Sequence, residues 1–201
     1  MRFACECGAV AGAIDRATPA EGDHVVCHCS DCRDLVRLLG KEARILDEHG
    51  GTALYQSRCA RMHFERGRER LAALHMTDGP TLRWYAVCCS TPLFNTYRNG
   101  RIPYLTTLLA NCDPQGRERL GKPLGHLFLD EAMGETSGLA PLSMNRLMRR
   151  FFRRMIKDIF SGDRRRSPLF EPQTLAPVVT PRRLTEPERN ALGRPGETGM
   201  R

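Results

Sequence analysis

Short apolar runs separated by turn-forming residues fill the first half of the chain, a pattern typical of β-strands. Residues 2–14 predict a strand, a turn and a strand, with Gly8 and Gly12 permitting turns or bulges. Further strands are predicted over residues 24–26, 52–57, 71–76 and 81–87. Thr77-Asp78-Gly79-Pro80 joins the last two, and Asp-Gly is a strong hairpin signal. A short helix is expected within residues 34–48.

A helical period replaces this pattern at Ser143. Apolar residues recur there at i, i+3, i+4 and i+7, namely Met144, Leu147, Met148, Phe151, Phe152, Met155, Ile156, Ile159 and Phe160. Ser143 is a suitable N-cap and Gly162 a suitable stop, and the opposite face is rich in arginine. The helix has three alternative roles: docking on the body, lying on anionic lipid, or self-association. Docking is favoured, because amphipathic helices most often complete a fold.

The chain therefore divides into a body at residues 1–142, a basic amphipathic helix at 143–162 and a tail at 163–201. Residues 113–142 carry many Gly and Pro residues and a few short apolar runs, and we assign no fold to them from the sequence. Pro, Arg, Glu, Thr and Gly dominate the tail, so we expect it to be largely disordered.

Charge is concentrated in the helical region. The net charge is +8, and residues 143–166 hold nine Lys or Arg against two acids, so the body is nearly neutral. The high pI is therefore no signature of nucleic-acid binding by the body. Nucleic acid is also an unlikely partner for the helix, because its Phe residues lie on the apolar face instead of between the arginines.

Nine cysteines in 201 residues is a high count. No apolar leader segment opens the sequence and no run of 18 apolar residues occurs, so we expect a cytoplasmic protein. In that compartment disulfides are disfavoured, and clustered cysteines are interpreted as metal ligands.

Three cysteines fall within six residues at Cys27, Cys29 and Cys32. Thiolates at this spacing predict a Zn²⁺ site whose fourth position is open, as in catalytic or ligand-exchanging sites. We expect His28 to face away from the sulfurs. Ser30, Asp31 and Arg33 follow, either as groups around the open position or as turn residues. Cys29 and Cys32 also have the spacing of a thioredoxin-type redox pair, but the third cysteine argues against that interpretation.

Two further pairs, Cys5 with Cys7 and Cys88 with Cys89, predict a second, closed zinc site. The alternative for the first pair is a strand with two small buried side chains. Adjacent residues on a strand face opposite ways, so Cys88 and Cys89 share one metal only if the chain bends at Ser90-Thr91-Pro92. Cys89 is favoured over Cys88, which is the least certain ligand. Isolated Cys59 and Cys112 are interpreted as buried small hydrophobes.

Cys-x-Cys-Gly near the start, Cys-His-Cys-Ser-Asp-Cys-Arg some twenty residues on, and an Arg-aromatic strand ending in Cys-x-Thr-Pro-Leu together resemble the GFA family. This family contains glutathione-dependent formaldehyde-activating and centromere protein V-like zinc domains. The resemblance covers residues 3–95. It departs from the family pattern where Ala86 replaces the earlier cysteine and Ser90 the glycine.

The resemblance implies a mainly β fold of small antiparallel sheets, of the β-tent type, clipped by zinc. It implies a structural zinc on Cys5, Cys7 and Cys89 with Cys88, and a second zinc on Cys27, Cys29 and Cys32 that acts with glutathione. No match exists for the helix at 143–161.

We therefore expect a carbon–sulfur lyase acting on glutathione–aldehyde adducts, with Arg33 or neighbouring basic residues pairing with glutathione carboxylates. No general base stands out. The alternative is a non-catalytic, zinc-stabilised binding module whose basic helix contacts a membrane or a protein partner.

Overall fold

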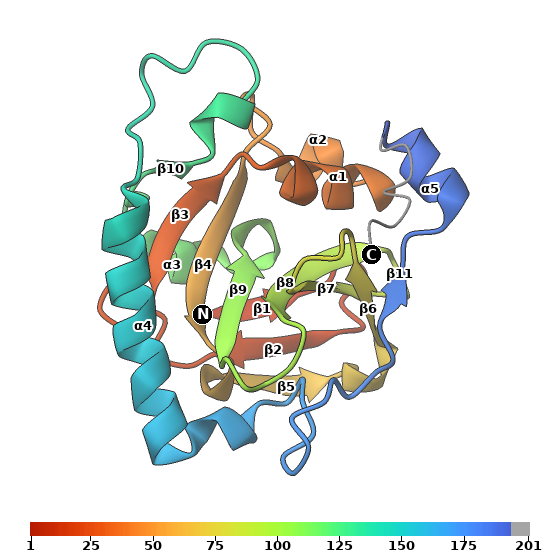
Figure 1. Ribbon diagram of the computed structural model, residues 1–201, viewed down its shortest axis with the longest axis vertical. Coiled ribbons are helices and arrows are strands. Elements are labelled where there is room, and N and C mark those ends of the chain that lie inside the picture. Colours follow the sequence, from red (N-terminus) through yellow and green to blue (C-terminus); the bar gives the residue numbers. More distant parts are fainter. Residues whose placement is uncertain (194–201) are drawn as a thin grey trace.

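Two β-sheets organise this computed structural model, which describes residues 1–193 (Figure 1). Within that range they form a three-stranded sheet in the order β1-β2-β5 and an eight-stranded sheet in the order β10-β3-β4-β9-β8-β7-β6-β11. The strands are β1 Arg2–Ala4, β2 Ala11–Ile14, β3 Asp23–Cys27, β4 Thr52–Arg58, β5 Met62–Arg66, β6 Leu71–His75, β7 Thr81–Ala86, β8 Thr91–Tyr97, β9 Tyr104–Leu108, β10 His126–Leu127 and β11 Arg182–Arg183. The prediction of a mainly β protein is confirmed.

The small sheet is antiparallel and depends on close backbone approach. β2 lies between β1 and β5, with a register shift between Ala11 and Gly12. A Cβ at Gly12 would lie 2.1 Å from the carbonyl oxygen of His63, so only glycine fits there. The predicted strand-turn-strand at residues 2–14 and its bulge are therefore both present.

The large sheet is antiparallel in its interior and mixed at its edges. β6 and β7 pair antiparallel through the predicted Asp-Gly hairpin. Short parallel pairings add β10 to β3 and β11 to β6, so the two edges are covered by segments far away in the sequence.

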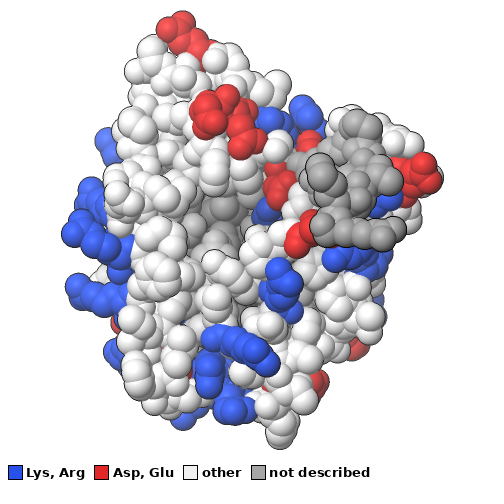
Figure 2. All heavy atoms as spheres, in the orientation of Figure 1, with Lys and Arg blue, Asp and Glu red and all other residues white. Residues whose placement is uncertain are grey.

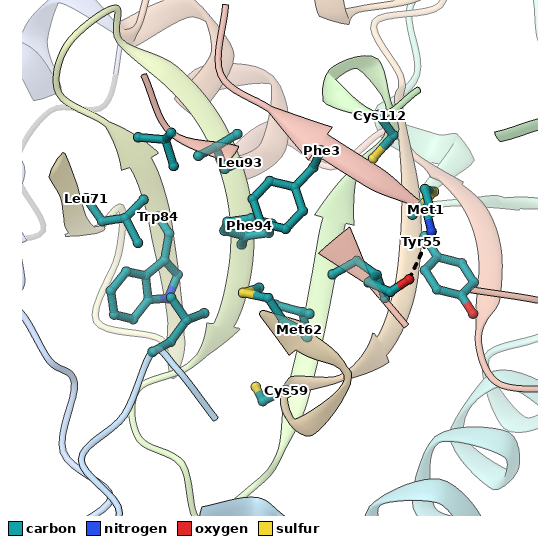
Figure 3. Packing of buried hydrophobic residues seen from close by; sticks show 14 of the residues in the cluster. Met1, Phe3, Tyr55, Cys59, Met62, Leu71, Trp84, Leu93, Phe94 and Cys112 are labelled. Carbon is teal, nitrogen blue, oxygen red and sulfur yellow. Dashed lines mark hydrogen bonds between the residues drawn. The ribbon is translucent and has the colours of Figure 1, made fainter. Parts of the chain in front are cut away.

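The main core lies between the two sheets (Figure 3). Phe3 of the small sheet meets Phe94 of β8 edge to face, with ring centroids 4.8 Å apart. Trp84 of β7 is fully buried, and its indole nitrogen donates a hydrogen bond to Thr96 at 2.8 Å. Burial of these aromatic rings supplies a large share of the hydrophobic stabilisation.

Five α-helices accompany the sheets within residues 1–193: α1 Ser30–Leu38, α2 Glu42–Ile45, α3 Pro114–Glu118, α4 Met144–Ser161 and α5 Glu186–Ala191. Single-turn 3₁₀ helices also lie at Cys59–Arg61, Arg68–Arg70, Leu109–Asn111, Leu129–Glu131 and Asp163–Arg166. The helix expected within 34–48 begins earlier, at Ser30, and is interrupted at Gly40, which has a φ of 65°.

Helix α4 matches its predicted bounds and docks on the body. Leu147, Phe151 and Met155 are buried, which confirms the docking interpretation. Arg150 and Arg154 both bind the buried carboxylate of Asp23 at the start of β3. Among the described residues, no helix has both the length and the apolar character required to cross a bilayer.

The expectation of a disordered tail is wrong for residues 163–193. Leu169, Phe170, Leu175 and Leu184 are buried, and the ring of Phe170 lies edge-on to Trp84. Leu169 and Phe170 are adjacent, and Leu175 and Leu184 lie apart from them and from each other, so the segment shows no helical or strand period. Residues 194–201 of the expected tail lie outside the described range.

Candidate metal centres

Cys5, Cys7, Cys88 and Cys89 come together as one group of thiols, here called the closed cluster. Cys5 and Cys7 follow β1 in a tight turn, where Gly8 adopts a φ of 74° and donates its N–H to the carbonyl of Cys5. The N–H of Val10 donates to the Cys5 sulfur at 3.2 Å. This geometry is a knuckle, a tight turn in which a backbone amide points toward a cysteine sulfur.

A bend in the backbone lets the adjacent residues Cys88 and Cys89 face the same point. Ser90 has a φ of 51°, in the left-handed region, directly after Cys89. The turn lets both thiols face Cys5 and Cys7 before β8 begins. Both are therefore in the cluster, as the predicted condition of a bend at this point requires.

The sulfur–sulfur distances in the closed cluster fit a single tetrahedral ion. The Cys88 sulfur lies 3.3 Å from that of Cys7 and 3.8 Å from that of Cys5, and the Cys5–Cys7 distance is 3.6 Å. A tetrahedron with metal–sulfur bonds of about 2.3 Å has edges of about 3.8 Å. Cys88, ranked last from the sequence, makes these short contacts, whereas the Cys89 sulfur also lies 3.0 Å from the Thr91 hydroxyl.

Cys27, Cys29 and Cys32 form a second group, here called the open cluster. Cys27 is the last residue of β3, Cys29 is the N-cap of α1, and Cys32 lies in the first turn of that helix. The Cys27 sulfur lies 3.3 Å from that of Cys29 and 3.8 Å from that of Cys32. Within residues 1–193, no fourth Cys, His, Asp or Glu joins them.

Arg83 is the functional candidate that the sequence interpretation did not single out. It lies on β7, is 5% exposed, and its Nη1 donates to the Cys32 sulfur at 3.5 Å. Its Nη2 lies 3.7 Å from the carboxylate of Asp31. The pKa of Cys32 is held well below its usual value, first by hydrogen bonding with the Cys27 and Cys29 thiols and then by the charge of Arg83. The sequence feature that could have identified Arg83 is its position as a charged residue within an otherwise apolar predicted strand.

The other predicted residues around the open cluster have clear partners. His28 is fully buried, and its Nε2 lies 2.9 Å from Nδ1 of His126, so it is not one of the clustered ligands. Arg33 donates to the carbonyl oxygen of Glu131 at 2.9 Å, and the N–H of Ser30 donates to the Glu131 carboxylate. These bonds fix the start of α1 against the segment after β10.

Cys59 and Cys112 lie outside both clusters, as expected. Each is buried, and burial raises the pKa of each thiol to about 12. Both therefore behave as neutral apolar side chains.

Comparison with known proteins gives one family match. Residues 1–179 match the model described as a family of unknown function, DUF6151. No curated protein matches. A crystal structure of a Rhodobacter sphaeroides protein has a TM-score of 0.40 and 18% sequence identity, over 60% of this chain and 97% of that chain.

Proposed function

The chain belongs to DUF6151, a family without an assigned function, and we propose that it is a zinc-dependent carbon–sulfur lyase of GFA type acting on glutathione–aldehyde adducts. The proposal rests on the chemistry of the open cluster and on the motif resemblance over residues 3–95. It takes the two sheets to be a β-tent-like scaffold clipped by the closed cluster.

The observation that carries the proposal is the difference between the two clusters. The closed cluster offers four sulfurs, whereas the open cluster offers three, with no fourth protein ligand among the described residues. Four protein ligands are typical of structural zinc, and three leave one position for an exogenous ligand. Bound zinc at such a position stabilises a thiolate at neutral pH.

The reaction requires little of the protein beyond binding and charge stabilisation. In the synthetic direction the thiol sulfur of glutathione adds to the aldehyde carbon, and the thiol proton ends on the former carbonyl oxygen. The lyase direction breaks the same carbon–sulfur bond and returns that proton to sulfur. Arg83 places a buried positive charge beside Cys32, where it favours thiolate at the cluster.

Arg33 stays our candidate for contacting a glutathione carboxylate. Its Nη1 is engaged with backbone oxygens, yet its guanidinium has five N–H donors, and the side chain is only half-buried. It follows Cys32 directly in the first turn of α1, so a thiol ligand at the open cluster brings its own charged groups near it.

Replacing Cys29 with serine is expected to slow thiol–aldehyde exchange by about 100-fold or more, because losing the metal removes several kcal/mol of charge stabilisation. NMR exchange spectroscopy between free and glutathione-bound ¹³C-formaldehyde measures this rate. Cys112→Ala, which removes an isolated buried thiol, should leave the rate within about twofold. Equal rates with wild-type protein, the Cys29 variant and buffer would exclude the lyase and favour the non-catalytic, zinc-stabilised binding module.

A further inference from the structure

Helix α4 keeps an apolar stripe exposed after it has docked. Phe152, Ile156 and Phe160 recur every four residues and are 53%, 50% and 86% exposed. The core contact of the helix is made by a different stripe, formed by Leu147 and Phe151 with Met155. The exposed stripe is therefore not needed to pack α4 against the body.

A cationic groove borders this stripe. Its volume is about 590 Å³, and it lies between α4 and the loop at Pro19 and Ala20, lined by Arg146, Arg149, Arg150, Arg153 and Arg154. Figure 2 shows Lys and Arg side chains gathered along the edge that α4 forms in Figure 1. Arg150 and Arg154 share the single carboxylate of Asp23, which balances one of their two positive charges.

Three arginines of the groove stay uncompensated. No carboxylate within residues 1–193 forms an ion pair with Arg146, Arg149 or Arg153, and all three are exposed. The surface thus combines an apolar stripe with an adjacent row of cationic groups along one helix. An anionic bilayer surface complements both features, because apolar side chains enter the boundary of the acyl chains and cationic side chains pair with the lipid phosphates.

We propose that α4 binds an anionic lipid surface, with its axis parallel to the membrane. Phe152, Ile156 and Phe160 enter the boundary between headgroups and acyl chains, and Arg149 and Arg153 contact lipid phosphates. A second copy of the chain is a poorer occupant, because a symmetric contact through the stripe brings the two arginine rows close together. Nucleic acid is poorer too, because the aromatic rings do not alternate with the arginines.

Co-sedimentation with vesicles tests the proposal on the full chain. Phosphatidylcholine vesicles containing phosphatidylserine are expected to bind at least about tenfold more tightly than phosphatidylcholine alone, with binding weakened by salt. The double variants F152S/F160S and R149E/R153E should each lose about tenfold in affinity. All four side chains are exposed, so circular dichroism should show an unchanged fold.

Matched controls use exposed residues outside α4. F128S/M133S removes two apolar side chains of 43% and 47% exposure, and R68E/R119E reverses two exposed charges. Both should bind vesicles as the wild type does. Equal binding to neutral and anionic vesicles, or equal losses in the controls, would overturn the proposal. The proposal would also be overturned if the protein did not bind vesicles and these residues were instead needed for a dimer in sedimentation velocity or for a complex with an oligonucleotide.

Discussion

Replacing Cys5 with serine is expected to leave the protein unfolded or nearly so at 25 °C. The closed cluster joins the turn after β1 to the turn before β8, and these are far apart in the sequence. A structural zinc contributes on the order of 10 kcal/mol, which is comparable to the whole stability of about 5–15 kcal/mol expected for a domain. Thermal unfolding followed by circular dichroism, together with zinc content, measures the effect.

The control for this result is a cysteine outside both clusters. Cys112→Ala removes a buried thiol of the same core and should cost about 1 kcal/mol. Prolonged chelation of the wild-type protein should reproduce the loss seen with Cys5→Ser. A Cys5→Ser protein that melts within a few degrees of the wild type would show that the closed cluster holds no structural metal.

Asp158→Ala is expected to destabilise the protein by about 3–5 kcal/mol, the usual cost of breaking a buried ion pair. Asp158 is fully buried on α4, and its carboxylate accepts a 2.5 Å hydrogen bond from Arg58 of β4, which is 3% exposed. Removing the carboxylate leaves the partly exposed Glu21 as the one remaining ion-pair partner of the guanidinium within residues 1–193. Denaturant unfolding measures the change in the free energy of unfolding.

Two companion variants identify the cause. Asp163→Ala removes a largely exposed ion pair with Arg166, in the 3₁₀ turn that follows α4. This change should cost less than about 1 kcal/mol of stability. Combining Asp158→Leu with Arg58→Met removes both charges and should recover most of the stability, because apolar replacement of a buried pair is often neutral. If Asp158→Ala costs no more than Asp163→Ala, the pair does not hold α4 to the sheet.

Local patterns predicted the parts of this fold that local interactions determine. The Asp-Gly hairpin between β6 and β7 and the bounds of α4 follow from turn chemistry and helical periodicity. Both cysteine clusters follow from ligand spacing. The hairpin, α4 and the open cluster each depend on residues close together in the chain, whereas the closed cluster combines two such local pairs from distant segments.

Features that depend on distant residues were missed or misjudged. Arg83 is near Cys32 only because β7 and α1 meet in the fold. The parallel pairing of β11 with β6 has no sequence signal, since two residues are too few to show a period.

The most direct test of the account is the zinc content and coordination of the open cluster. Elemental analysis of wild-type protein and of the Cys27→Ser, Cys29→Ser and Cys32→Ser variants counts the zinc ions per chain. X-ray absorption on the same proteins, with and without glutathione, reports the average number of sulfur ligands per zinc. We predict about two zinc ions per chain, falling to about one in each variant, and an additional sulfur ligand when glutathione is added to the wild type. One zinc in all four proteins, with coordination unchanged by glutathione, would contradict an open thiol-binding site.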